Sequence, residues 1–457
     1  WKMKIILKAA LVLFIFSMHV FSQLPNSNMR LIANKNEHFT NFYSAIWGYT
    51  APDGSEYAIL ACANGTAFYN ITDTNNVVES GFVPGLTSLW REFKTFGHYA
   101  YIVSEAYGSG LQVVDLQYLP DSVSLVNTIT FTGYARTHTI SQEGPYLYLS
   151  GGDYNGGGIF IFDVSTNPVN PVKRGNWYEH YIHDCRVYND TIWGAAIFDG
   201  YIYAIDAVNK DSMRTITRWY NMPQPGPHNT AITEDGSYLY VTDEIGGFPR
   251  LLKVWEVDNL TNPLLVAQWQ PTGIDSSIVH NVEIYGNYAL AAHYTAGVRL
   301  LNISNPTVPV EIAWYDTYPQ NNGFTYDGCW GVYMFPSGKI IASDRSTGLY
   351  VLKSSAIPPI GINSNGSEVP AGYKLEQNYP NPFNPVTKIN YSLPKNAYVK
   401  LYVYDASGRL VRKLVDSFEP AGNRSISFNA GELSSGVYFY SMQADDNYLS
   451  KKMILIK

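Results

Sequence analysis

Four histidines occupy matching places along this chain, and together their side chains could bind a metal ion. His138, His183, His228 and His280 each stand at the start of a short, largely apolar segment. Imidazole nitrogens, supported by carboxylate oxygens such as those of Glu244, are common ligands of divalent metal ions. The chain has no local metal motif such as HExxH, so these residues can meet only if the fold gathers them.

A repeated strand pattern supplies the elements that would position the histidines. Each copy is a run of apolar or alternating residues, usually opened by Gly and closed by Asp or Asn. The copies end at successive distances of 43 to 52 residues, which is the spacing of propeller blades. The seven copies close at Asn70, Asp115, Asp163, Asp206, Asp258, Asn302 and Lys353.

Each copy is the third strand of a larger unit of four antiparallel strands. The first two strands are joined by residues that tolerate positive φ and favour hairpin turns. A fourth strand follows a turn marked by Pro, as at Pro168 and Pro306, and Pro suits an outer edge strand. The expected hairpin turns are Asp53-Gly54, Gly97-His98, Glu143-Gly144, Asn189-Asp190, Asp235-Gly236, Gly286-Asn287 and Ser337-Gly338.

The last unit lacks its fourth strand, and the first unit is preceded by an unassigned strand-like stretch from Met29 to Ala33. We expect this stretch to complete the seventh unit and close the ring, because closure removes exposed sheet edges. The chain is therefore predicted to be all-β: a seven-bladed β-propeller over residues 23–353, followed by a small antiparallel β-sandwich over residues 372–457. A ring of six or eight blades is the alternative.

In a propeller the first strand of each blade lines the central channel, so equivalent residues of different blades form a ring. Arg91 or Trp90, Trp330 and Trp47 take the histidine position in other blades. A second strand returns to the face where the first begins, and its end should bring further polar side chains to the same mouth. These are Glu105, Asp153, Glu244, His293 and Asp344, and residues Asp184, Asn229 and Asn281 could orient the imidazole rings.

Three interpretations of this constellation remain open. The histidines could form a hydrogen-bonding wall of a wet channel. They could hold a divalent metal, with His138, His183, His228, His280, His293 and Glu244 as ligands. They could also bind a small anionic or polar ligand together with Arg91, Trp90, Glu105, Asp184, Asn229, Asn281 and Trp330. The sequence predicts a binding or interaction module, with a metal-dependent enzyme as the alternative.

The two ends of the chain indicate secretion. Lys4 and Lys8 precede an apolar run, so residues 1–22 are predicted to be a signal peptide. A segment rich in Pro, Gly, Ser and Asn predicts a linker over residues 354–371, before the C-terminal domain. No later run of about 18 apolar residues is present, so we expect no membrane span in the mature chain.

Composition narrows the class of partner. The net charge is −7, and the segment from Gln23 to Ala371 alone carries 17 Lys/Arg against 31 Asp/Glu. This acidic balance argues against nucleic acid as a partner. The three cysteines, Cys62, Cys185 and Cys329, lie far apart and are expected to be buried thiols.

The repeats resemble the LVIVD repeat of bacterial extracellular propellers. Ile46-Trp47-Gly48, Trp90-Arg91-Glu92 and Asp243-Glu244 are among the stretches that look like the choice-of-anchor B family, over roughly residues 44–353. That family is named for its varied C-terminal anchors and implies a fold and a location, not a reaction.

The C-terminal domain resembles a type IX secretion sorting domain. Its NYPNPFNP sequence at 378–385, SGVYFY at 435–440 and KKMILIK at 451–457 carry the likeness, in this order. The resemblance implies a Bacteroidetes-like Gram-negative cell, the type IX secretion machinery as a partner, and a final location outside the cell or on its outer surface. An ordinary carbohydrate-binding sandwich is the alternative.

Overall fold

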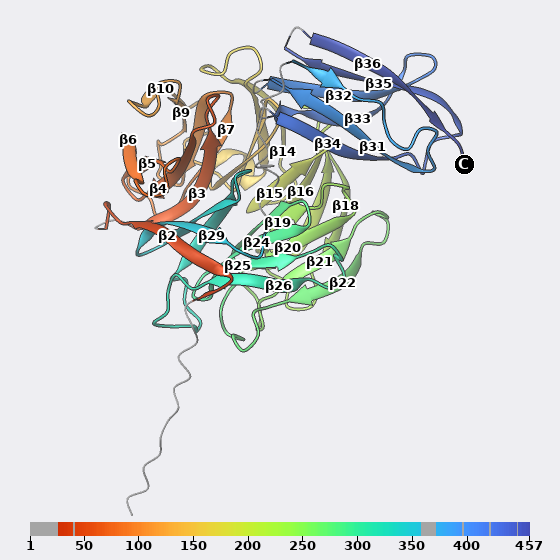
Figure 1. Ribbon diagram of the computed structural model, residues 1–457. Helices are drawn as coiled ribbons and strands as arrows, with labels where there is room; N and C mark the ends of the chain where they lie inside the picture. Colours follow the sequence, from red (N-terminus) through yellow and green to blue (C-terminus); the bar gives the residue numbers. More distant parts are fainter. Residues whose placement is uncertain (1–25, 40–41, 358–371, 395–396, 420–421, 446) are drawn as a thin grey trace, which may run out of the picture.

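Residues that alternate or run continuously as apolar segments fold into strands, and Figure 1 shows that nearly the whole chain is β. The computed structural model describes residues 26–39, 42–357, 372–394, 397–419, 422–445 and 447–457. Within these ranges the one helical element is a short 3-10 turn, η1 (Tyr154–Gly157). The predicted signal peptide lies outside the described residues, as does most of the predicted linker.

Seven sheets follow one another along the chain, and within each sheet consecutive strands pair antiparallel. The first four blades contain β3 (Tyr43–Thr50), β4 (Glu56–Cys62), β5 (Gly65–Asn70) and β6 (Val78–Pro84); β7 (Arg91–Phe96), β8 (Tyr99–Ser104), β9 (Leu111–Asp115) and β10 (Ser124–Ile129); β11 (Thr139–Glu143), β12 (Tyr146–Ser150), β13 (Ile159–Asp163) and β14 (Val172–Trp177); β15 (Asp184–Tyr188), β16 (Thr191–Ala196), β17 (Tyr201–Asp206) and β18 (Arg214–Tyr220).

The remaining three blades follow the same order. They contain β19 (Pro227–Ile232), β20 (Tyr238–Asp243), β21 (Leu252–Glu256) and β22 (Leu264–Trp269); β23 (Asn281–Tyr285), β24 (Tyr288–His293), β25 (Gly297–Asn302) and β26 (Val310–Tyr315); β27 (Cys329–Met334), β28 (Lys339–Asp344) and β29 (Gly348–Ser354). This arrangement confirms the predicted seven-bladed propeller.

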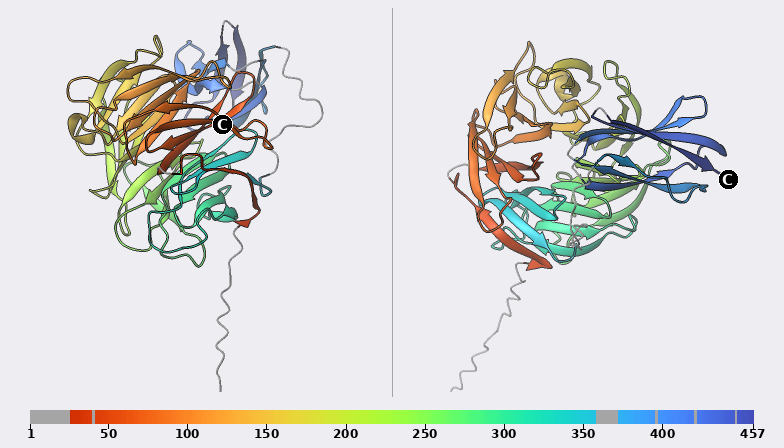
Figure 2. Two further views of the ribbon diagram at one scale, coloured as in Figure 1. Left: turned by 90° about the vertical axis from the view of Figure 1, so that its left-hand side faces the viewer. Right: turned by 45° about the horizontal axis from the view of Figure 1, so that its top comes forward.

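The first residues of the fold close the ring. Strand β2 (Met29–Lys35) pairs antiparallel with β29 and is the fourth strand of blade 7. Figure 2 shows the red N-terminal strand beside the cyan end of the propeller. The two-residue strand β1 (Asn26–Ser27) extends blade 6 by pairing with β26. The predicted closure is therefore confirmed, and no gap separates the first blade from the last.

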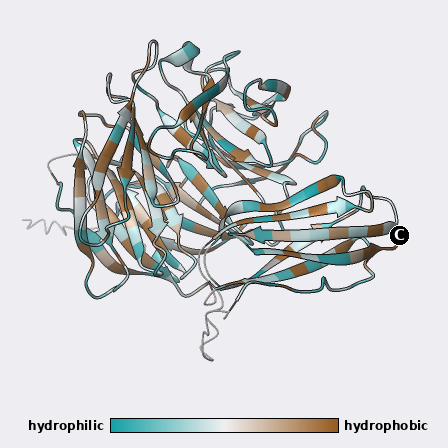
Figure 3. Ribbon diagram, turned by 90° about the horizontal axis from the view of Figure 1, so that it is seen from above, coloured by the Kyte–Doolittle hydropathy of each residue, from teal (hydrophilic) through white to brown (hydrophobic). Residues whose placement is uncertain are grey.

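Burial explains why inner and outer strands differ in sequence. Every residue of β4 is buried, because neighbouring blades cover both faces of the inner strands, and such strands read as continuous apolar runs. In the outer strand β18, exposed residues alternate with half-buried ones. Brown segments accordingly dominate many inner strands in Figure 3.

All seven predicted hairpin turns contain a residue with positive φ. The residues are Gly54, Gly97, Gly144, Asn189 and Asp190, Gly236, Gly286 and Gly338. The three cysteines are free and buried, as expected.

The C-terminal domain is a sandwich of two antiparallel sheets. One contains β30 (Lys374–Leu375), β31 (Val386–Leu393) and β34 (Gly422–Asn429); the other contains β32 (Ala397–Asp405), β33 (Leu410–Glu419), β35 (Gly436–Ala444) and β36 (Asn447–Leu455). Their inner faces share one apolar core that includes Ile389, Leu401 and Tyr440.

This sandwich contacts the propeller at the turns between first and second strands. The Tyr398 ring lies 6.2 Å from that of Phe96, between centroids, and Lys413 Nζ lies 3.9 Å from an Asp190 carboxylate oxygen. First strands begin at one end of the channel and reach these turns at the other. The sandwich thus packs on the end opposite the residues that begin the first strands.

We expect Gly348→Ala to destabilise the propeller more than Gly338→Ala. Both glycines have φ near +80°, so both substitutions carry the same backbone strain of about 1–2 kcal/mol. A Cβ at Gly348 would lie 2.3 Å from the Lys35 carbonyl oxygen of β2, whereas at Gly338 it would meet nothing within 4 Å. The clash should cost a further ~1–3 kcal/mol. Urea denaturation, monitored by tryptophan fluorescence, measures the free energy of unfolding of each variant. Equal losses of stability in the two variants would contradict the role of β2.

Candidate functional site

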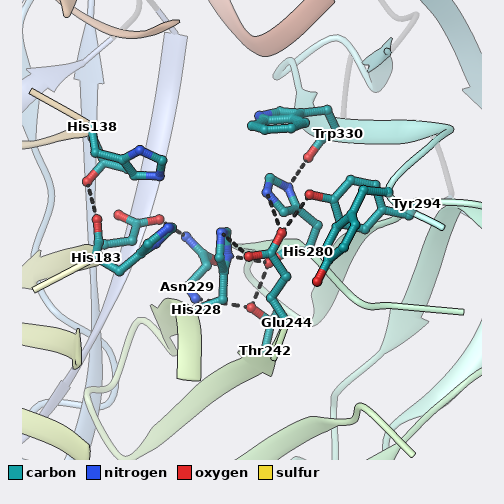
Figure 4. Close-up of polar contacts among 12 residues, drawn as sticks. His138, His183, His228, Asn229, Thr242, Glu244, His280, Tyr294 and Trp330 are labelled. Atoms are coloured by element: carbon teal, nitrogen blue, oxygen red, sulfur yellow. Dashed lines mark hydrogen bonds and ion pairs between the residues drawn. The ribbon is translucent and has the colours of Figure 1, made fainter. Parts of the chain in front are cut away.

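One residue from each blade forms a ring at the mouth of the channel, where the first strands begin. Each lies within one residue of the first residue of its first strand; these residues are Ser44, Arg91, His138, His183, His228, His280 and Trp330. Ring centroids are 4.1 Å apart for His138 and His183, 4.4 Å for His183 and His228, and 4.3 Å for His228 and His280. Four histidines distant in sequence thus form one continuous arc (Figure 4).

Hydrogen bonds between blades hold two of these imidazoles in a defined tautomer. His228 Nδ1 donates to the His280 carbonyl at 2.9 Å, and His280 Nδ1 donates to the Trp330 carbonyl at 2.5 Å. Thr242 also donates to the His280 carbonyl, at 2.6 Å. A carbonyl can only accept, so Nδ1 carries the proton and Nε2 keeps a lone pair while the ring is neutral.

These lone pairs face the carboxylate of Glu244, which directly follows β20. His228 Nε2 lies 3.6 Å from one carboxylate oxygen and His280 Nε2 lies 3.8 Å from the other. Tyr294 donates its hydroxyl to Glu244 at 2.7 Å and holds the carboxylate in place. Figure 4 shows this convergence.

His183 completes a set of donor groups suited to a metal ion. Ligand atoms of His183, His228 and Glu244 all lie within 4.8 Å of one another. Ligands held at about 2.0–2.1 Å by a tetrahedral ion lie roughly 3.4 Å apart, so small side-chain movements would bring them to bonding distance. The buried Nδ1 of His183 has no hydrogen-bond partner among the described residues.

Burial, and then the charge of neighbouring imidazoles, lower the pKa of His183 and of His280 well below the usual value. Both rings are therefore neutral at pH 7, the form that binds metals.

His138, at the end of the arc, has a different electrostatic setting. Its Nδ1 lies 2.6 Å from a carboxylate oxygen of Glu105. Burial would lower the pKa of His138, but the hydrogen bond and charge of Glu105, with Glu92 and Asp184, outweigh burial and raise it. Burial acts in the opposite sense on Glu105, and its pKa is nevertheless lowered by His138. His138 is therefore the charged imidazole of the arc, and Glu105 is its carboxylate partner.

A second row of polar residues lies one residue further along the first strands. Asn229 donates to Asp184 at 2.6 Å and accepts from the Val282 amide at 3.0 Å. No hydrogen bond joins Asp184, Asn229 or Asn281 to an imidazole in the described part of the chain. The expectation that they orient the rings is wrong: main-chain carbonyls of the next blade orient His228 and His280, and the Glu105 carboxylate orients His138.

A small cavity of about 20 Å³ lies at the mouth, among residues of the ring and the second row. Arg91 takes the ring position of blade 2, and Trp90 precedes it on the rim, 36% exposed. The cavity is lined by Ala45, Trp90, Arg91, Glu92, His138, Thr139, Asp184, His228, His280, Asn281 and Trp330. Burial raises the pKa of Glu92 to about 7, although Lys94 partly offsets the effect.

The channel is bridged by ion pairs deeper inside. Arg186 of blade 4 reaches Glu283 of blade 6 at 2.6 Å. Trp47 lies at this level, with Lys94 Nζ 3.7 Å from its ring centroid. The expectation that Trp47 takes the histidine position is wrong, because Ser44 is the residue of β3 that lies beside the Arg91 main chain.

His293 does not join the arc. Its Nδ1 is 3.1 Å from the Ser277 hydroxyl, and its ring faces Trp269. Successive side chains of a strand point to opposite sides, so the next residue, Tyr294, reaches Glu244 instead. Asp153 and Asp344 also miss the arc, since they accept bonds from nearby loop amides.

Sequence reasoning overlooked Tyr294 and Thr242. Tyr294 directly follows its second strand, as Glu244 and Glu105 follow theirs. Applying that offset to blade 6 would have found it. Thr242 lies inside β20 and carries no comparable signal.

Two family comparisons match parts of the chain. Residues 377–457 match the secretion system C-terminal sorting domain, and residues 277–317 match the LVIVD repeat. The C-terminal domain is a sorting domain. It directs the protein through the type IX secretion machinery to the cell surface or the exterior. No curated protein matches this chain.

Solved structures with low sequence identity are similar to this chain. A candidate 6-phosphogluconolactonase from Bacteroides uniformis is 11% identical, with a TM-score of 0.51, covering 84% of this chain and 99% of that one. A protein from Lactobacillus plantarum is 12% identical over 84% and 98%, with a TM-score of 0.49. At this identity the first likeness indicates the propeller fold alone. Within the described residues, no helix is long and apolar enough to cross a membrane.

We expect His293→Gln to weaken the acid sensitivity of the propeller. Burial, with Arg299, lowers the pKa of His293 to about 3. Between pH 6.5 and 3 the unfolded chain binds a proton here that the native protein excludes, so stability falls on acidification by about 1.4 kcal/mol per pH unit. Between pH 6.5 and 4, the free energy of unfolding of the variant should therefore fall by ~3 kcal/mol less than that of wild type. Urea unfolding at several pH values in this range measures the difference. If the free energies of unfolding of the two proteins fall in parallel with pH, the prediction is wrong.

Proposed function

We propose that this secreted propeller is a binding module whose channel mouth holds a divalent transition-metal ion such as Zn²⁺. His183, His228 and Glu244 are the proposed protein ligands, and His280 lies beside them. A ligand from outside the cell would bind at this centre and contact Trp90, Arg91, Asn281 and Trp330.

The proposal rests above all on the convergence of electron-pair donors at Glu244. His280 is neutral, its proton is on Nδ1, and its Nε2 faces a carboxylate oxygen at 3.8 Å with no hydrogen between them. His228 Nε2 faces the other oxygen at 3.6 Å. The lone pair of the neutral His280 ring and the carboxylate oxygen repel each other in a buried site, and a bound cation would convert that repulsion into attraction.

The donor set favours a transition metal over calcium or magnesium. Two imidazoles and one carboxylate suit zinc and its neighbours, whereas calcium and magnesium prefer oxygen ligands. Three protein ligands would leave a coordination position open, and His228 is the one of the three that lines the cavity. An external ligand could take that position.

A metal-dependent enzyme is the second candidate function. Glu92 lines the same cavity, and its pKa of about 7 suits a group that accepts a proton from water at neutral pH. Hydrolysis of p-nitrophenyl acetate that requires both the metal and Glu92 would favour the enzyme. Metal binding without turnover would favour the binding module. The likeness of the propeller to the choice-of-anchor B family stays a prediction.

We expect the purified mature protein to bind one equivalent of Zn²⁺. His228→Ala and Glu244→Gln should each lower the affinity about 100-fold or more, because each removes a ligand atom. Isothermal titration with Zn²⁺ and elemental analysis measure affinity and stoichiometry.

The matched control is His98→Gln, which changes a histidine that is 39% exposed at the opposite end of its blade. This variant should bind Zn²⁺ as wild type does. If wild type binds no stoichiometric Zn²⁺, or if all three variants lose it equally, the proposed centre does not exist.

A further inference from the structure

A buried carboxylate of blade 7 lacks a partner for one of its two oxygens. Asp344 ends β28, the second strand of that blade, and is 0% exposed. Its Oδ1 accepts from the Ser346 and Thr347 amides, each at 2.9 Å. Its Oδ2 has no hydrogen-bond partner among the described residues, and no Lys, Arg or His nitrogen of those residues lies within 4.0 Å of the carboxylate. Because a buried carboxylate without a counter-charge is costly, this oxygen is a candidate ligand atom for a cation.

The matching position of blade 5 shows how the same backbone neutralises such a carboxylate. Asp243 ends the second strand of blade 5, and its Oδ2 lies 2.7 Å from Lys253 Nζ. The ammonium also donates to the Asn221 carbonyl at 2.6 Å and to the Pro223 carbonyl. The Asn221 side-chain amide donates to Asp243 Oδ1 at 2.8 Å. One carboxylate and two main-chain carbonyls therefore surround a fully buried cation.

In blade 7 a neutral side chain stands where blade 5 has its lysine. Lys253 pairs with the residue two before Asp243, and Tyr350 pairs with the residue two before Asp344. The two positions are therefore equivalent in register. Since a phenol carries no charge at neutral pH, Asp344 loses the counter-charge that Asp243 has.

Blade 7 also has an acidic residue where blade 5 has a neutral one. Asn221 directly follows the last strand of blade 4, and Asp316 directly follows the last strand of blade 6. Burial raises the pKa of Asp316; the Tyr318 amide and Arg299 oppose this shift, and the charge of Asp344 adds to it. The two carboxylates therefore interact. Blade 5 balances one negative charge with one positive charge, whereas this boundary gathers two negative charges.

Further oxygen atoms lie beside the two carboxylates. The Tyr350 hydroxyl lies 2.9 Å from the Thr347 hydroxyl and donates to the Thr317 carbonyl at 3.4 Å. These contacts join the turn after Asp344 to the loop that begins at Asp316. Thr317 is 4% exposed, and its buried hydroxyl has no hydrogen-bond partner among the described residues. Carboxylate, hydroxyl and carbonyl oxygens are the ligands that calcium prefers.

Two arginines near this boundary have partners elsewhere. Arg299 pairs with Glu311 at 3.4 Å. The guanidinium carbon of Arg345 lies 5.3 Å from the ring centroid of Trp330. Neither arginine has a nitrogen within 4.0 Å of the two carboxylates. The described side chains thus supply no cation in direct contact with them.

We propose that a calcium ion binds between blades 6 and 7, at the position that the Lys253 ammonium takes between blades 4 and 5. Asp344 Oδ2, the Asp316 carboxylate and an oxygen of Thr317 are the proposed ligands, and water would complete the shell. The ion would tie the loop after blade 6 to the blade that closes the ring. These ligands are separate from the histidine arc, so the inference does not depend on the proposed function.

The test is a calcium titration of the mature protein after divalent ions have been removed with EGTA and dialysis. Isothermal titration should show one equivalent of Ca²⁺ bound with a Kd of about 10⁻⁴–10⁻³ M, the range of extracellular calcium modules. The melting temperature should rise with Ca²⁺ concentration, because the ion binds the folded state. Asp344→Asn should raise the Kd about tenfold or more, since a charged ligand is lost. Asp121→Asn changes an exposed carboxylate between β9 and β10 and should bind Ca²⁺ as wild type does.

Tyr350→Lys is the sharpest variant, because it restores the side chain that blade 5 has. Its ammonium should take the place of the ion, so neither calorimetry nor the melting temperature should respond to Ca²⁺. Combining it with Asp316→Asn reproduces the whole blade 5 set and should give the same result. If Asp344→Asn fails to fold, these two variants carry the test.

The outcomes keep this site apart from the proposed transition-metal centre. His228→Ala should bind Ca²⁺ as wild type does, and loss of Ca²⁺ binding in that variant would contradict a separate site. If wild type binds no Ca²⁺ at concentrations up to about 10 mM, the inference is overturned. It is also overturned if Tyr350→Lys and Asp344→Asn bind Ca²⁺ with the affinity of wild type.

Discussion

The site depends on closure of the ring by the pairing of β2 with β29. This pairing joins residues near the N-terminus to the last blade, and it covers a strand edge that would otherwise be open. A closed ring fixes the tilt and spacing of all seven first strands, and hence the distances between their first residues. The 4.1–4.4 Å spacing of the imidazoles is a consequence of this closure.

Closure is reinforced at the mouth by hydrogen bonds that cross from one blade to the next. The Arg91 carbonyl accepts from Ser44, the His183 carbonyl from Thr139, the His280 carbonyl from His228, and the Trp330 carbonyl from His280. The same bonds that join the blades also decide which imidazole nitrogen carries the proton. Structure and chemistry are thus coupled: His228 and His280 join neighbouring blades through Nδ1, and their Nε2 atoms face Glu244.

The electrostatics of the mouth differ from those of the chain as a whole. The segment from Gln23 to Ala371 is acidic, yet the mouth places a charged His138–Glu105 pair beside the neutral imidazole of His183. Deeper in the channel, the Arg186–Glu283 pair bridges blades. The sorting domain packs on the far end, at the turns near Phe96 and Asp190. The mouth is consequently the end that this domain leaves open to ligands.

The repeat of apolar runs, turn residues and spacing was sufficient to predict seven blades, the closing strand and the hairpin turns. These features are local or periodic, and each copy reports the same backbone geometry. The sorting domain could also be predicted from the sequence, because its motifs are contiguous. Periodicity also assigned His138, His183, His228 and His280 to equivalent positions, and it assigned Glu105 and Glu244 to the ends of their strands.

The direction of individual side chains was decided by the tertiary structure alone. A shift of one residue at the end of β24 turns His293 into the blade and brings Tyr294 to the mouth. At the start of β3, Ser44 lies beside the Arg91 main chain, and Trp47 lies deeper, beside Lys94. The bonds from His228 and His280 to carbonyls of the next blade likewise depend on backbone atoms that no residue type reveals. Sequence periodicity identifies which positions are equivalent, but the side a residue faces at an irregular strand end depends on contacts with the neighbouring blade.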